Sequence, residues 1–130
     1  MWGAERAGKS AAANTLEKQG YPWTLSHDAP VTPSPSVLAL VDAAVNRRTA
    51  SGNIIGPDER VTPYAALGAV TRSAAFQIKE EKTKGTLEAG KLADLVILDR
   101  NPLKADPATI KTITVMQTLK EGVTVYEAKP

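Results

Sequence analysis

Residues 85–99 have the sequence GTLEAGKLADLVILD, and this stretch decides the fold. Gly85 and Gly90 flank a short polar segment, and a glycine supplies the positive φ that a tight turn needs at little steric cost. Residues 92–99 are then apolar and rich in β-branched side chains, until Asn101 and Pro102 interrupt them. This pattern predicts a turn followed by a strand with apolar neighbours on both faces.

The end of the chain has the pattern of a small antiparallel unit. Residues 110–118 alternate loosely between apolar and polar side chains, and residues 123–126 read VTVY. Glu121 and Gly122 lie between the two runs, where a glycine favours a tight hairpin turn. We therefore expect a β-hairpin that follows the strand of residues 92–99.

The first half of the chain predicts helices around one short strand. Residues 4–19 contain helix-forming side chains and Gly20 is expected to end the helix, so one helix is expected there. Residues 23–26 are expected to form a strand, with His27 and Asp28 at its C-terminal end. Three prolines follow within eight residues, and such a segment cannot be helical.

Two more helices are expected after the proline-rich loop. Ser34 and Pro35 are a suitable N-cap and first-turn pair for a helix that continues to Arg48 with apolar residues at helical spacing. Thr62 and Pro63 cap a third helix with a thin apolar stripe of small side chains. The charged run of residues 79–84 is expected to be a solvated connector between the helical half and the strand-rich half.

Composition excludes several classes of protein. The chain is 42% hydrophobic and 23% charged, which is within the ordinary range of globular proteins. A net charge of +2 with scattered basic residues gives little support to a nucleic-acid surface. No cysteine is present, so disulfides and thiolate metal sites are excluded. No apolar run approaches the roughly 18 residues that span a bilayer, and a cytoplasmic location is expected.

Residues 3–10 match the phosphate-binding pattern GxxxxGKS in every fixed position. A phosphate loop needs a buried strand that delivers its first glycine, and only two residues precede Gly3. The segment also has the composition of a continuous helix, which would place Gly3 and Gly8 on one helix. A P-loop nucleotide binder is therefore a remote alternative, and a surface helix is preferred.

Five motifs in order resemble the metal-dependent amidohydrolases. The pattern GxLxxGxxADLVILD with Asn101-Pro102-Leu103 is similar to the C-terminal signature of that superfamily. The resemblance is closest to the amidohydrolase-3-type branch, some members of which carry the name exoenzyme regulatory protein. It extends through residues 26–31, 46–48 and 57–60 to the helix that opens at residue 62, so it covers nearly the whole chain.

The resemblance implies an α/β fold and the C-terminal part of a larger enzyme. Residues 1–78 would form the last helix-strand-helix part of a (β/α)8 barrel, with the strand ending at Asp28 and two helices after it. Residues 79–130 would supply strands of a small flanking β-sandwich. A barrel of this type needs roughly 250 residues, and this chain has 130.

The resemblance assigns the chemistry to Asp28. Asp28 matches the aspartate at the end of the eighth barrel strand, which acts in the family as general base on metal-bound water and protonates the leaving amine. The family more often has a serine directly before this aspartate, whereas this chain has Ser26-His27-Asp28. Alternation along a strand would point His27 away from Asp28, so a supporting or structural role for His27 is favoured over that of a metal ligand.

The histidine count limits what the chain can do alone. A catalytic zinc generally needs three protein ligands, and His27 is the only histidine. We therefore expect a divalent metal such as zinc only in the intact protein, where Asp28 would bind it together with upstream ligands. The isolated chain is expected to hold no cofactor and to be inactive.

Other polar residues are given structural interpretations. Arg47 and Arg48 are expected to interact favourably with the dipole at a helix C-terminus, rather than to bind substrate. Asp94 and Asp99 are expected to be turn and edge residues.

Two functions of different classes follow from the sequence. The first is a fragment of an enzyme that hydrolyses non-peptide carbon–nitrogen bonds of a small amide substrate. The alternative is a non-catalytic regulatory or protein-interaction module that uses the same end of the fold. Neither nucleic acid nor a membrane is an expected partner, and self-association is expected because faces made for absent neighbours would be exposed.

Overall fold

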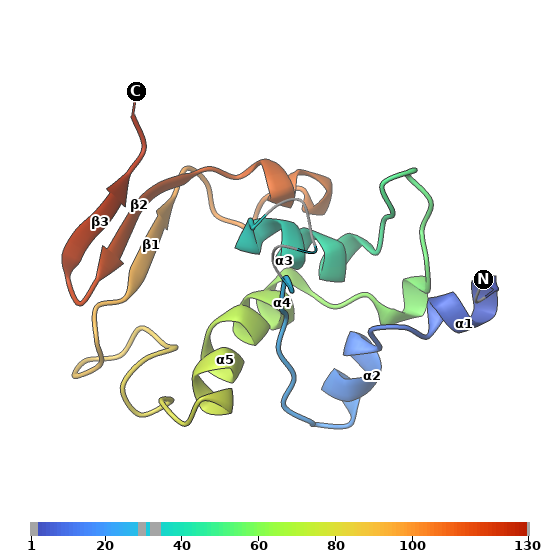
Figure 1. The fold of residues 1–130 in the computed structure, drawn as a ribbon, viewed down its shortest axis with the longest axis horizontal. Coiled ribbons are helices and arrows are strands. Elements are labelled where there is room, and N and C mark those ends of the chain that lie inside the picture. Colours follow the sequence, from blue (N-terminus) through green and yellow to red (C-terminus); the bar gives the residue numbers. More distant parts are fainter. Residues whose placement is uncertain (1–2, 29–30, 32–34, 130) are drawn as a thin grey trace.

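Helices and strands occupy separate ends of the structure (Figure 1). The computed structural model describes residues 3–28, 31 and 35–129. In chain order its elements are α1 (Ala4–Gly8), α2 (Ala13–Lys18), α3 (Val37–Asn46), η1 (Pro57–Glu59), α4 (Pro63–Val70), α5 (Arg72–Gln77), β1 (Leu95–Leu98), η2 (Pro107–Thr112), β2 (Val115–Lys120) and β3 (Val123–Glu127), where η denotes a 3-10 helix. The mixed α/β content that the sequence predicted is confirmed.

The core lies among the helices, and it includes a residue from the strand-rich half. Val41 of α3 and Ile110 of η2 are both fully buried. The Asn46 side chain donates a hydrogen bond to the Pro107 carbonyl at 2.8 Å, which holds η2 against α3. The buried cluster comprises Ala13, Val41, Ala44, Val45, Val61, Ala65, Ala66 and Ile110. The segment that joins β1 to β2 is therefore part of the helical core.

Side-chain caps determine where two of the helices begin. The Thr62 hydroxyl accepts a hydrogen bond from the Ala65 amide at 3.1 Å, with Pro63 in the first turn, so the predicted start of the third helix is confirmed. The N-cap of α3 is Ser36, whose hydroxyl accepts from the Ala39 amide. The predicted cap Ser34 lies outside the described residues, and the helix begins after Ser36 instead.

The single helix predicted over residues 4–19 is wrong, because the chain forms two short helices there. Ala11 lies between α1 and α2 with a φ of 50°, a left-handed conformation that cannot continue an α-helix. The break leaves the carbonyls of residues 8–11 without helical partners, and the side chain of the residue that follows α3 satisfies three of them.

That side chain is Arg47, which joins three parts of the chain. Its Nη1 donates to the Ala11 carbonyl at 2.9 Å, and its Nη2 donates to the Gly8 and Ser10 carbonyls at 3.2 and 2.9 Å. Its Nε donates to the Ile55 carbonyl at 3.0 Å. The prediction that Arg47 has a structural role at the helix C-terminus is consistent with this arrangement, although its partners come mainly from other segments.

The strand predicted over residues 23–26 is absent, since residues 21–28 have no regular secondary structure. Within the described residues, residues 23–26 form no hydrogen bond between backbone groups. A strand is defined by pairing with a neighbour, and no strand of the described chain lies beside this segment. The local pattern predicted an extended backbone correctly, but it could not supply the partner.

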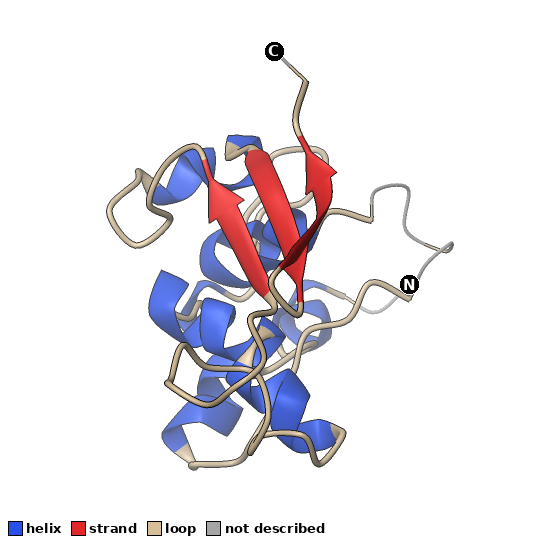
Figure 2. Ribbon diagram, turned by 90° about the vertical axis from the view of Figure 1, so that its left-hand side faces the viewer, coloured by secondary structure: helices blue, strands red, loops and turns tan. Residues whose placement is uncertain are grey.

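The three strands form an antiparallel sheet in the order β1-β2-β3, and Figure 2 shows them in front of the helices. The hairpin between β2 and β3 turns at Glu121 and Gly122, as predicted. β1 covers only residues 95–98 of the predicted strand, and Val96 and Ile97 are 55% and 48% exposed. The prediction of apolar neighbours on both faces is therefore wrong, because nothing in the described chain covers both sides of this sheet.

A close contact between two glycines tests the packing of α1. A Cβ on Gly56, whose φ is 55°, would collide with the Gly8 carbonyl oxygen, whereas a Cβ on Gly52, whose φ is 86°, would meet nothing. We expect Gly52→Ala to cost about 1 kcal/mol of unfolding free energy for its left-handed backbone, and Gly56→Ala about 3 kcal/mol because the collision is added. Urea unfolding of both variants measures the difference, and equal costs would contradict this packing.

The Arg47 contacts make a second prediction about stability. Arg47→Ala removes the guanidinium donor of four carbonyls, of which only the Ala11 carbonyl keeps a second donor, the Ala13 amide, and we expect it to lower the unfolding free energy by about 2 kcal/mol or more. The neighbouring Arg48 is exposed and makes one long hydrogen bond to the Gly52 carbonyl, at 3.4 Å. Arg48→Ala is the matched control, with an expected change of about 0.5 kcal/mol or less. A similar loss in both variants would refute the role of Arg47.

Candidate functional site

Asp28 lies at the end of the extended segment with its side chain exposed to solvent. Its φ is 50°, and aspartate is among the few non-glycine residues that enter this left-handed region readily. The Asp28 carbonyl accepts a hydrogen bond from the Val31 amide at 2.8 Å, and its own amide donates to the Ser26 hydroxyl at 3.4 Å. These two bonds hold the backbone of Asp28, and the residue stays exposed.

The segment that leads to Asp28 is held by its side chains instead of by its backbone. Trp23 and Leu25 pack against the helical core, and the Trp23 indole nitrogen donates to the Glu17 carboxylate at 2.7 Å. The Thr24 hydroxyl donates to the side-chain oxygen of Gln77 at 3.0 Å. Alternate side chains thus bind on different sides, as they do along a β-strand.

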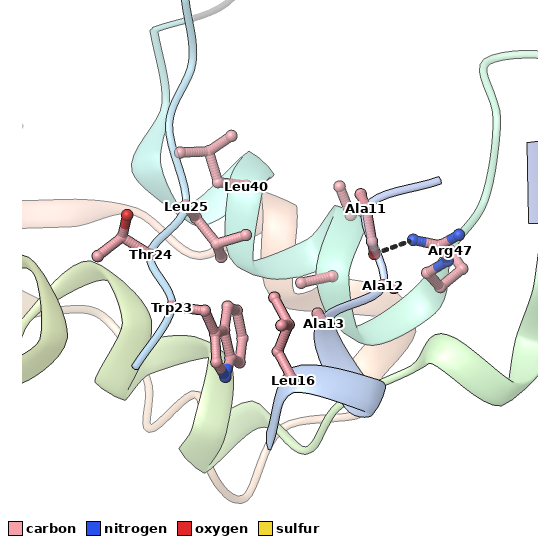
Figure 3. A pocket seen from close by; sticks show the side chains of 11 residues that line it. Ala11, Ala12, Ala13, Leu16, Trp23, Thr24, Leu25, Leu40 and Arg47 are labelled. Carbon is pink, nitrogen blue, oxygen red and sulfur yellow. Dashed lines mark hydrogen bonds between the residues drawn. The ribbon is translucent and has the colours of Figure 1, made fainter. Parts of the chain in front are cut away.

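An apolar pocket of about 240 Å³ lies beneath this segment, between α2 and α3 (Figure 3). Its lining includes the apolar side chains of Leu16, Trp23, Leu25 and Leu40. Arg47 lies at one end, and the dashed line in Figure 3 marks its hydrogen bond to the Ala11 carbonyl. Neither His27 nor Asp28 belongs to its lining. The pocket is therefore a packing feature behind the segment, separate from the candidate catalytic position.

His27 is half-buried, whereas the side chain of its neighbour Asp28 is exposed. The two residues therefore have different surroundings, and the interpretation of His27 as a supporting or structural residue stays a prediction. Across residues 3–28, 31 and 35–129, no three side chains of His, Cys, Asp or Glu are grouped so that they could hold a metal ion. The residues present do not by themselves fit a catalytic metal site.

The carboxylates whose pKa is shifted, Glu59, Glu88 and Asp94, lie elsewhere and have structural partners. Hydrogen bonds from the Thr15 hydroxyl and amide lower the pKa of Glu59, and this contact ties η1 to α2. The Glu121 amide and the Lys120 ammonium lower the pKa of Asp94, at the start of β1. Asp99 accepts from the Thr114 amide at 3.1 Å. Asp94 and Asp99 thus bind the turns and edge of the sheet, as predicted.

The phosphate-loop pattern of residues 3–10 adopts a different structure from a phosphate loop. Gly3 is the N-cap of α1 and Gly8 is its last residue, so most of the pattern is helical. Lys9 forms an exposed ion pair with Glu5 at 3.1 Å. The carbonyls of Gly8 and Ser10 are turned towards Arg47. This geometry lacks the converging amides of a phosphate cradle.

Sequence reasoning missed the residues that hold the segment before Asp28. Glu17 and Gln77 were not singled out, because their contacts join positions 6 and 53 residues apart. The period-2 alternation of residues 23–26 was the available signal, and it shows which side chains need partners but not where those partners come from.

Among the described residues, none of the helices has both the length and the apolar character that a membrane span requires.

Comparisons with known proteins agree with the resemblance in the sequence. A model of the amidohydrolase family matches residues 1–126. The chain is 32% identical over 130 residues to an N-substituted formamide deformylase from Arthrobacter pascens, which covers 98% of this chain and 24% of that protein. It is 29% identical over 135 residues to YtcJ of Bacillus subtilis (strain 168), which is named as an amidohydrolase. That match covers 97% of this chain and 25% of YtcJ.

The fold is also similar to that of a solved protein. An amidohydrolase from Thermotoga maritima MSB8 superposes with a TM-score of 0.66 at 22% identity, over 89% of this chain and 26% of that one. The chain thus spans about a quarter of the length of the relatives that it matches. Because the family model matches almost all of its residues, the chain belongs to the amidohydrolase family.

Proposed function

We propose that this chain is the part of an amidohydrolase that contributes a catalytic carboxylate, Asp28, to the hydrolysis of a non-peptide carbon–nitrogen bond. The family membership supports a hydrolase. The observation that carries the assignment is the position of Asp28, which is exposed and follows a segment held against the helices by its side chains. Barrel enzymes place catalytic side chains at such strand ends.

In the proposed reaction, Asp28 moves one proton. Its carboxylate accepts a proton from the water whose oxygen attacks the amide carbon, and it then donates that proton to the departing amine nitrogen as the carbon–nitrogen bond breaks. A positioned general base of this kind contributes roughly 10²- to 10⁴-fold to the rate. His27 is proposed to support Asp28 from the half-buried side of the segment.

A divalent metal such as zinc would supply an activated water to this reaction. The described residues do not fit such a metal alone, since no three potential ligands are grouped and the whole chain has one histidine. The remaining ligands must come from outside these 130 residues, with Asp28 as at most one of the set. The isolated chain is accordingly proposed to be inactive.

Within the part of the chain that the structure describes, the backbone of residues 23–26 forms no hydrogen bond to another backbone group, and this supports a place inside a larger barrel. Residues 23–25 are half-buried, where backbone groups without partners are costly, and flanking parallel strands would satisfy them on both edges. In this proposal the segment is the last strand of a (β/α)8 barrel, and the three-stranded sheet belongs to a flanking sandwich. The alternative, a non-catalytic interaction module, is favoured only by the incomplete set of metal ligands.

A chimera tests the proposal. The 130 residues replace the matching quarter of the Arthrobacter pascens deformylase, and turnover of an N-substituted formamide is measured with metal content. We expect Asp28→Asn to lower kcat by about 100-fold or more, because it removes the proton acceptor while the size of the side chain is kept. We expect His27→Asn to have a smaller effect.

Two controls decide between the hypotheses. The 130-residue chain alone is expected to bind less than one metal ion per molecule and to show no turnover. A folded chimera that retains its metal and its activity after Asp28→Asn would exclude the catalytic role. A stoichiometric metal and steady turnover in the chain alone would exclude the proposed dependence on outside ligands.

Self-association is proposed for the isolated chain, through the face of the sheet that carries Val96. Register pairs Val96 with Thr118 and Thr118 with Tyr126, so these side chains share one face, together with Met116 two residues away. Val96 and Tyr126 are both at least half exposed. We expect light scattering to show mass rising with concentration, and Val96→Lys to reduce that rise because it buries a charge. A constant monomer mass would contradict the proposal.

A further inference from the structure

Two sequence features that the proposed function does not use are brought together in the structure. The Ser10 end of the phosphate-loop pattern and the arginine pair, Arg47 and Arg48, are separated by more than 35 positions. Ser10, Arg47, Arg48 and Thr49 nevertheless line one surface depression of about 190 Å³. We propose that this depression, the arginine depression, binds a small tetrahedral oxyanion such as phosphate.

Both arginines keep N–H groups that hydrogen bonds within the described chain do not use. A guanidinium has five N–H groups, and four of those on Arg47 are used by the carbonyls of residues 8, 10, 11 and 55. One N–H group on Nη1 of Arg47 is not used by these carbonyls. Arg48 makes a single long bond, from Nη1 to the Gly52 carbonyl at 3.4 Å, so four of its N–H groups remain. Both neighbouring cations therefore present donors to the same depression.

The positive charges of Arg47 and Arg48 also favour a bound anion. Within the described residues, neither Arg47 nor Arg48 forms an ion pair with a carboxylate. The charge of Arg47 contributes to the low pKa of Glu59, but the Glu59 carboxylate is bound to Thr15. Two adjacent cations repel each other, and the charge of Arg47 is partly removed from water because this residue is half-buried. An anion in the depression would compensate both.

The guanidinium groups also indicate which kind of anion the arginine depression binds. Guanidinium groups bind phosphate oxygens through paired N–H bonds. The hydroxyls of Ser10 and Thr49 already donate to the Ala7 and Asn53 carbonyls, at 2.9 and 3.2 Å, so the two guanidinium groups carry the recognition of the anion. The site does not use the phosphate-loop lysine, since Lys9 is engaged by Glu5. It also lies away from Asp28, which is not part of its lining. The inference is therefore independent of the proposed hydrolysis.

Nuclear magnetic resonance titration of the 130-residue chain tests the site. Inorganic phosphate replaces chloride at constant ionic strength, and the amide signals of Ser10, Arg48 and Thr49 are followed. We expect saturable shifts at these three residues. Arg48→Gln is expected to raise the Kd at least about tenfold, because it removes charge-assisted hydrogen bonds. This variant is expected to fold, since the Arg48 side chain holds little of the structure.

Arg100→Gln is the matched control, because it removes the same charge at a residue that bonds Thr112 at a different place. It is expected to leave the Kd within about twofold. Adenosine monophosphate distinguishes a free phosphate from one carried on a larger molecule: tighter binding at the same residues identifies a phosphate ester as the ligand, and weaker binding identifies the free ion. Shifts that do not saturate, or that are equal in wild type and Arg48→Gln, would overturn the proposal.

Discussion

The position of Asp28 depends on the packing of Trp23 and Leu25 against the helices. These side chains hold residues 23–26 extended although the described chain offers the backbone of the segment no partner. The bonds from Trp23 to Glu17 and from Thr24 to Gln77 add two polar contacts on different sides. The segment therefore resembles a strand in its shape and in its alternation, and it lacks only neighbours. Every functional conclusion about Asp28 rests on this arrangement.

Arg47 has a comparable role for the fold as a whole. Its guanidinium replaces the helical hydrogen bonds that residues 8–11 lose where α1 and α2 separate, and it reaches Ile55 in the loop before η1. Ile110 makes the corresponding apolar contact, since its fully buried side chain packs η2 of the strand-rich half into the helical core. These two residues join segments that are remote in the sequence, and together they keep the helices around the segment before Asp28.

The sequence predicted the features that depend on neighbouring residues. The Thr62-Pro63 start, the turn at Gly122 and the roles of Asp94 and Asp99 follow from local capping and turn chemistry. It failed where distant contacts decide the structure. The break at Ala11 is bridged by Arg47 from 36 positions away, and Val96 is exposed because the described chain provides no layer that covers it. For the candidate site, the sequence led to the prediction of Asp28, which stays a prediction. It did not indicate Glu17 or Gln77, because no local pattern shows which remote side chain will bind an extended segment.

The central claim is that residues 23–26 form a barrel strand when the rest of an amidohydrolase is present, and that this strand delivers Asp28. Hydrogen exchange at the amides of residues 23–26 measures this most directly, in the 130-residue chain and in the same residues joined to the remaining three quarters of the Arthrobacter pascens deformylase. The account predicts rapid exchange in the chain alone, where these amides have no backbone partner, and strong protection in the joined protein. Equally rapid exchange in both proteins would contradict it.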